Sequence, residues 1–274
     1  MRLSLIGFGI LLLAPLSAAV AAAQSGGFIY APGTQHYRLV TDVHRAQIQG
    51  GGRAPFEFDV KTTQLVTVHI TPRARDTLAL ELTLDSVAVS TEFNAPQPDV
   101  KHLFGAKLDG LISPQGKVYS FNPPAGNTDP QIEALYGAFE RFLVSFPQKP
   151  ITVGTSWADT TLEHVNKDGF NVTARAVTLT RVAGDTTVNG QHVWRVVRHS
   201  DIVQSGEHSQ EGGEPLQLLG QGTVNAVHLL THDGVYLSSQ SMQRIDITMK
   251  NSLSETAPIQ QTIKSTVERL PNGA

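Results

Sequence analysis

Alternation of apolar and polar residues is the dominant pattern along this chain. The clearest case is Thr77–Val89, in which the even-numbered positions from Leu78 to Leu84 are all leucine and their neighbours are polar or small. A period of two is typical of a β-strand with one dry face. The alternation slips by one position at Asp85-Ser86. This slip predicts a β-bulge, because a bulge adds one residue and bends the strand.

Weaker alternation predicts further strands on both sides of this one. Runs at 37–48 and 56–70 precede it, and 108–121 reads as a hairpin that turns at Ser113-Pro114-Gln115-Gly116. The hairpin signals Asp168-Gly169, Asn189-Gly190 and Asp233-Gly234 separate the later runs. The strands predicted there are Ile151–Val165, Phe170–Val182, His192–Gln204, Gly222–Leu230, Val235–Met249 and Ile259–Leu270.

One segment between these runs has the period of a helix. Its apolar residues recur at three- and four-residue spacing: Ile132, Leu135, Tyr136, Phe139, Phe142, Leu143 and Phe146. Asp129 suits the N-cap and Pro130 the first helical position, while Pro147 and Pro150 end the run. The pattern predicts an amphipathic helix over 129–146.

These elements predict a mainly β fold of the β-rich α+β class. A first meander (35–121), the helix (129–146) and a second meander (151–270) would form a single domain over 35–270. The two meanders would make a curved sheet or half-barrel around the helix, because a helix with one apolar face needs a partner. Two separate small β-domains are the alternative, disfavoured because no linker composition separates the halves.

The N-terminus has the pattern of a secretory signal peptide over residues 1–23. Arg2 precedes a short apolar stretch that Pro15 interrupts, and Ala21-Ala22-Ala23 fits cleavage before Gln24. An uncleaved membrane anchor is the alternative. We expect residues 24–34 to be disordered, no transmembrane segment after cleavage, and an exported protein, periplasmic or extracellular.

Composition removes several function classes. The chain has 274 residues, 21 Lys and Arg, 24 Asp and Glu, and no cysteine, so its net charge of −3 gives no basic footprint for nucleic acid. No nucleophile, phosphate-binding or dinucleotide motif occurs, and the ten histidines are scattered. His199-Ser200-Asp201 has the residue types of a catalytic triad, but neighbours on a strand point to opposite faces. We therefore predict no enzyme, no catalytic residues, no metal site and no cofactor.

The order of features resembles a family of uncharacterised exported bacterial proteins, a domain of unknown function. The likeness rests on Gly105–Gly110 followed by Gly116-Lys117-Val118, and above all on the run Phe146–Trp157, which reads FPQKPITVGTSW. Thr155 stands where the family often has Asp. The resemblance implies shape and export and no activity. At the level of architecture the chain is also similar to half-barrel lipoprotein carriers of the LolA and LppX type.

Two function hypotheses remain, with an unrecognised hydrolase behind them. The first is a non-enzymatic carrier of a lipid or other hydrophobic ligand in a β half-barrel. Its expected cavity-lining residues are Leu80, Leu82, Tyr136, Phe139, Phe142 and Trp157. The alternative is a structural or protein-interaction component of the cell envelope, acting through a surface or sheet edge. The same six residues would then form a filled core.

Overall fold

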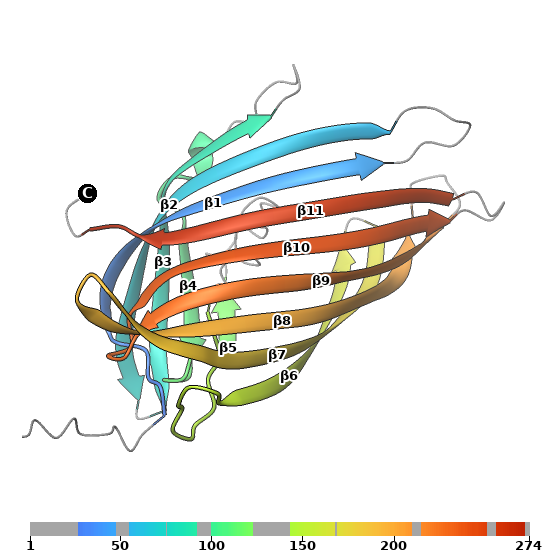
Figure 1. Ribbon diagram of the computed structural model, residues 1–274. Helices are drawn as coiled ribbons and strands as arrows, with labels where there is room; N and C mark the ends of the chain where they lie inside the picture. The colour runs from blue at the N-terminus through green and yellow to red at the C-terminus, as the bar shows by residue number, and fades with distance from the viewer. Residues whose placement is uncertain are drawn as a thin grey trace, which may run out of the picture.

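The computed structural model describes residues 27–47, 55–74, 76–91, 100–122, 143–167, 169–209, 215–250 and 256–271. They form long antiparallel strands and one 3₁₀ turn, η1 (Lys101–Leu103) (Figure 1). The strands are β1 (Gly33–Gln47), β2 (Phe56–Ala74), β3 (Thr77–Thr91), β4 (Lys107–Ile112), β5 (Val118–Asn122), β6 (Ser156–Lys167), β7 (Phe170–Val188), β8 (Gln191–His208), β9 (Leu216–Thr231), β10 (Tyr236–Lys250) and β11 (Thr256–Arg269).

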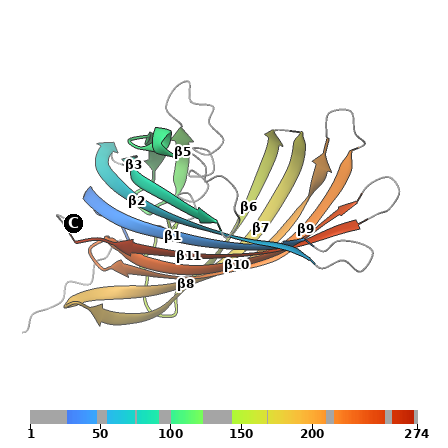
Figure 2. The ribbon, with the colours of Figure 1, turned by 90° about the horizontal axis from the view of Figure 1, so that it is seen from above.

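All eleven strands belong to one sheet in the order β5-β4-β3-β2-β1-β11-β10-β9-β8-β7-β6. Strands that are neighbours in sequence pair with each other, except β5 and β6, which form the two edges of the sheet. The first and last strands pair in the middle of the sheet, from Tyr37↔Arg269 to Gln47↔Ile259. The sheet curves so that its two edges rise on the same side (Figure 2). It therefore has a concave and a convex face.

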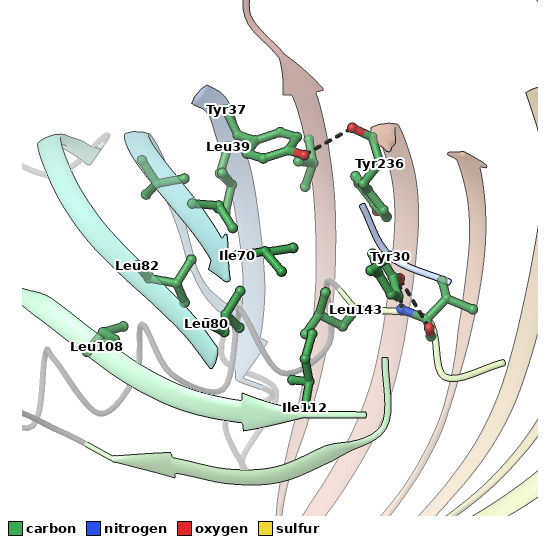
Figure 3. Close-up of a cluster of buried hydrophobic side chains, with 14 of the residues drawn as sticks. Tyr30, Tyr37, Leu39, Ile70, Leu80, Leu82, Leu108, Ile112, Leu143 and Tyr236 are labelled. Atoms are coloured by element: carbon green, nitrogen blue, oxygen red, sulfur yellow. Dashed lines mark hydrogen bonds between the residues drawn. The ribbon is translucent and has the colours of Figure 1, made fainter. Parts of the chain in front are cut away.

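Apolar side chains fill one end of the concave face. Leu80 and Leu82 of β3 lie there with Ile70 of β2 (Figure 3). Val66 and Val68 of β2 belong to the same cluster, as do Val196 and Leu230 from the far half of the sheet. Residues 27–32 and 143–147 cross this end and add Phe28, Tyr30, Leu143, Val144 and Phe146 to the same cluster. We call this region the packed end.

The alternation in the sequence predicted β3 and its bulge correctly. Leu78, Leu80, Leu82 and Leu84 are all buried. Leu65 pairs with Ser86 whereas Val66 pairs with Leu84, so Asp85 is the extra residue. The expected hairpin turns also form: β4 and β5 are joined through 113–117, and Asn189-Gly190 has φ angles of 49° and 80°, both positive as a two-residue hairpin turn requires.

The expected fold class is wrong, because the described residues form an all-β structure with no α-helix and no helix between two meanders. Of the predicted helix 129–146, residues up to 142 lie outside the described residues, and 143–146 are not helical. The side chains of Leu143, Val144 and Phe146 are buried in the packed end. Their apolar character serves to cover the sheet, which any backbone shape can do, so helical spacing did not decide the structure.

The expectation that residues 24–34 are disordered is also wrong for the described part, 27–34. Phe28 and Tyr30 are 5% and 1% exposed, and Gly33 begins β1. Tyr30 Oη donates to the Val144 carbonyl at 3.1 Å and accepts from its amide at 3.0 Å. These bonds fix the segment before β1 to the packed end. The predicted signal peptide, 1–23, lies outside the described residues.

Candidate functional site

The convex face of the sheet faces water. It is polar over β1, β2 and β11, whereas over β6 to β9 it also carries exposed Leu162, Leu179, Val203 and Leu219. Cross-strand ion pairs lie on it between exposed side chains, among them Arg38–Glu268 at 2.6 Å and His44–Asp59 at 2.9 Å. Histidine–threonine hydrogen bonds, such as His36–Thr67 at 2.9 Å, add to this surface. An antiparallel sheet with one solvated face must bury the other to be stable. The concave face therefore holds the buried core of the sheet.

Beyond the packed end, the concave face continues as rows of apolar side chains. Strand pairing sets one row directly, since Val60 pairs with Val43 and Val43 with Ile263. We call this region the open concave face. Its half-buried apolar members are Val43, Phe58, Val60, Ile202, Val224, Ile245, Ile247, Met249 and Ile263.

Polar and small residues break up these apolar rows. Gly220 and Gly222 of β9 lie opposite Ile247 and Ile245 of β10, so this stretch of β9 carries no side chain on the concave side. The guanidinium of Arg45 lies 5.9 Å from the ring centre of Phe58. Gln243 and Gln261 of the same rows lie opposite Ile263 and Ile245, so the open concave face mixes apolar and polar side chains. Sites for small molecules combine an apolar lining with placed polar groups.

Of the six expected cavity-lining residues, the structure describes Leu80, Leu82 and Trp157. Leu80 and Leu82 are 3% and 2% exposed and are closed into the core of the packed end. Trp157 is half-buried beside Phe146, and its indole N–H donates to the Ser145 carbonyl at 2.9 Å. For Leu80 and Leu82 the structure supports the filled-core alternative. Tyr136, Phe139 and Phe142 lie outside the described residues.

A buried polar cluster, which the sequence did not reveal, lies in the packed end. Tyr37 Oη donates to the Tyr236 carbonyl at 3.0 Å, and Tyr236 Oη lies 2.9 Å from His228 Nδ1. Burial, reinforced by the positive charge of Arg198, lowers the pKa of His228 to about 3. Burial also raises the pKa values of Tyr37 and Tyr236. These groups are therefore neutral hydrogen-bonding partners near neutral pH.

A small cavity adjoins this cluster. It has a volume of about 20 Å³ and is lined by Tyr30, Gln35, Tyr37, Ile70 and Tyr236, among others. That volume suits a single water molecule. Gln35 Oε1 is buried without a hydrogen-bond partner among the described residues. The cavity can therefore hydrate the cluster, but it cannot hold a lipid.

The candidate triad is not assembled. Ser200 points to the concave side and bonds Thr178 at 2.8 Å, whereas His199 and Asp201 lie exposed on the convex side. His232 Nε2 lies 3.1 Å from Asp185 Oδ1. Even so, no group of three or more metal-ligating side chains in the described part of the chain is arranged to hold an ion.

Comparisons with known proteins found few relatives. No family model matches the chain, and no curated protein matches it. The resemblance drawn from the FPQKPITVGTSW run therefore stays a prediction. The helix on which the likeness to LolA- and LppX-type carriers depended is not part of the described fold.

Solved structures gave matches of low similarity. One, from work on asymmetric conductivity of engineered proteins, is 7% identical, with 87% of this chain and 100% of that chain covered and a TM-score of 0.27. OccAB4 of Acinetobacter baumannii is 6% identical, with 86% and 98% covered and a TM-score of 0.23. An outer membrane channel of Pseudomonas putida F1 is 8% identical, with 89% and 98% covered and a TM-score of 0.20. At these TM-scores the likeness carries no argument about function.

No helix within the described ranges is long and apolar enough to cross a membrane.

Proposed function

We propose that this protein binds an elongated apolar molecule, such as a lipid acyl chain, along the open concave face of its sheet. The observation that carries the proposal is the contrast between adjacent residues of one strand. Ile245 and Ile247 of β10 lie half-buried on the concave side, while Arg244 and Asp246, which alternate with them, are exposed on the convex side. Apolar surface of this kind is stabilised when a ligand removes it from water.

The charge of Arg45 favours a ligand that has an acidic group at one end. Its guanidinium lies among the apolar residues of the open concave face and over the ring of Phe58. A cation in an apolar setting attracts an anionic group more strongly than one in bulk water does. An amphipathic ligand with an acidic head group therefore suits this face better than a neutral hydrocarbon. With export directed by residues 1–23, the protein would meet this ligand outside the cytoplasm.

Native mass spectrometry of residues 24–274, purified from a periplasmic expression without detergent, tests the proposal. We expect an extra mass in the lipid range that is released on denaturation. Ile245→Asn should reduce its occupancy, because an amide would then face the apolar ligand. Asp246→Asn places the same side chain on the convex side and should leave occupancy unchanged. A wild-type chain that is always free of added mass would refute the proposal.

Displacement of a fluorescent fatty acid tests the role of Arg45. Arg45→Met keeps a long apolar stem and removes the charge, so it should weaken binding of the fatty acid but not of the matching fatty alcohol. Equal loss for both compounds would mean that Arg45 shapes the face and does not recognise a head group.

A protein-interaction role is the second candidate function. It is favoured by the exposure of strand β6, in which residues 158–166 are exposed on both faces of the sheet.

A further inference from the structure

Strand β6 is a long, regular edge of the sheet. It lies at the end of the strand order and pairs with β7 over its whole length, from Ser156↔Arg181 to Lys167↔Phe170, without a register shift. The opposite edge, β5, is only 5 residues long and its pairing with β4 is irregular. Proteins normally protect edge strands by keeping them short or by adding bulges or prolines. Strand β6 has none of these three protections, and its only edge charges on the concave side within 158–166 are Asp159 and Glu163.

The exposure of β6 agrees with an unoccupied edge. Residues 158–166 are exposed whether their side chains lie on the convex or the concave side. Leu162, near the middle of the strand, is 72% exposed, the highest value among the large apolar side chains of the described residues. A second strand beside β6 would bury part of Leu162 and pair the outward backbone groups.

We propose that two copies of this chain pair edge to edge through β6, antiparallel and about a two-fold axis at Leu162. A two-fold axis perpendicular to the sheet places the convex faces of both copies on the same side of the joined sheet. The same strand then contacts itself, so the interface is self-complementary. Leu162 then faces the partner's Leu162 on the convex side. The two curved sheets become one continuous sheet across the interface.

The charged side chains of β6 favour this register over the neighbouring ones. With Leu162 on the axis, Asp159 faces the partner's Val165 and Glu163 faces the partner's Thr161, so no like charges are opposed. Moving the axis to Thr161 would place Asp159 opposite the partner's Glu163. Moving it to Glu163 would oppose the two Glu163 side chains. Like charges directly opposite each other destabilise a strand pair.

Registers farther away avoid this repulsion but pair less of the strand. An axis at Thr160 leaves Val165–Lys167 without a partner, and an axis at His164 leaves Ser156–Thr160 without one. The register centred on Leu162 leaves only Ser156 unpaired. It is therefore the longest pairing of β6 with itself that opposes no like charges.

The absence of cysteine from the chain makes the register directly testable. Leu162→Cys should form an intermolecular disulfide on mild oxidation, because directly opposed residues of antiparallel strands have Cα atoms close enough to be bridged. Leu219→Cys is the matched control. Leu219 is also an exposed leucine of the convex face, 53% exposed, but it lies on β9, away from the edge. We expect it to stay uncrosslinked.

Two further single variants test the neighbouring positions. Thr160→Cys and His164→Cys face each other across the proposed axis, so each alone should stay monomeric on oxidation and the two should crosslink when mixed. Crosslinking of either one alone would indicate a different register and would overturn the proposal.

Light scattering of the mature chain gives the second measurement. We expect twice the mass of one chain for wild type and a single-chain mass for Leu162→Lys, which opposes two ammonium groups on the axis. Circular dichroism checks that this variant stays folded, as expected for an exposed site. A wild-type monomer at all concentrations, a dimer that survives Leu162→Lys, or pairing of β6 with another protein only would each refute the self-pairing. These results are independent of ligand loading.

Discussion

At the scale of single residues, the packed end combines apolar packing with a few buried polar groups. His228 is 2% exposed, and one of its ring nitrogens lies 2.9 Å from Tyr236 Oη. Its other nitrogen, Nε2, has no hydrogen-bond partner among the described residues. A protonated imidazole here would be a buried charge beside Arg198, which explains the low pKa of His228. The fold therefore requires neutral His228.

This requirement predicts how stability depends on pH. In the unfolded chain His228 takes up a proton near pH 6.5, whereas in the folded protein its pKa is about 3. The stabilisation is thus complete above pH 6.5 and is lost as pH falls from there towards 3. When the pH is lowered from 7 to 5, this one group should reduce the free energy of unfolding by ~2 kcal/mol.

Urea unfolding at pH 7 and pH 5 measures the effect. His228→Gln keeps a hydrogen-bonding group and removes the titration, so its loss of stability between the two pH values should be smaller than that of wild type by that amount. His69→Gln, at an exposed histidine of β2 away from the β6 edge, is the control and should behave as wild type. Identical pH dependence of His228→Gln and wild type would contradict the prediction.

Sequence reasoning identified the buried leucines but missed this cluster. Alternation reveals which side chains lie on a dry face, and Leu78 to Leu84 follow it closely. His228 and Tyr236 lie on the two strands of one hairpin, but Tyr37 comes from the other end of the chain, and nothing in its local pattern signals that it meets them. His228 was one of ten scattered histidines, and its local pattern did not indicate that it would be buried.

At the scale of elements, a single residue sets the shape of β3. Asp85 is the extra residue of the bulge, and its carboxylate accepts a 2.7 Å hydrogen bond from the Thr67 hydroxyl. Without it, Leu84, Ser86 and Val87 would alternate in, out and in, which is the arrangement that β2 already pairs with. The bulge therefore bends the strand without being needed for its register.

Deletion of Asp85 should accordingly be tolerated. We expect the deletion variant to fold and to lose about 1 kcal/mol, the typical worth of one hydrogen bond. Deletion of Glu81, another carboxylate of the convex side of β3, is the control. It shifts the alternation where no bulge can absorb the change, so two buried leucines must turn outward at about 2–5 kcal/mol each. Equal losses of unfolding free energy for the two deletions would contradict this prediction.

The elements also mark where sequence patterns stop being informative. Turn residues such as Asn189-Gly190 were predictable because positive φ angles restrict residue choice. The apolar spacing within 129–146 predicted a helix, yet 143–146 lie unwound against Tyr30 and Trp157. Apolar residues at mixed spacing can be buried by a helix or by an irregular segment, and only tertiary contacts decide between the two.

At the scale of the whole molecule, one pairing joins the two halves of the sheet. Strands β1 and β11 lie side by side although Tyr37 and Arg269 are at opposite ends of the chain. No residue in either strand identifies the other as its partner, so sequence alone could predict two meanders but not how they join. This pairing also brings the start of β1 next to the end of β11, with the Leu270 amide donating to the His36 carbonyl at 2.8 Å.

The position of this pairing predicts the behaviour of a circular permutant. A flexible Gly/Ser linker from Pro271 to Gly27, with new ends between Asn122 and Pro123, would place all eleven strands in sequence order across the sheet. The longest-range pairing would then become local. Folding slows as contacts become more distant in sequence. We therefore expect the permutant to refold on the order of tenfold faster than the unpermuted chain, residues 27–271.

Stopped-flow tryptophan fluorescence measures the rate, and a second permutant supplies the control. New ends between Asn189 and Gly190 use the same linker but make the β7–β8 pairing the most distant one. That permutant should fold to the same structure without the acceleration, because it exchanges one long-range pairing for another. If both permutants accelerated alike, linker closure alone would explain the rate. If neither did, the meeting of β1 and β11 would not limit folding.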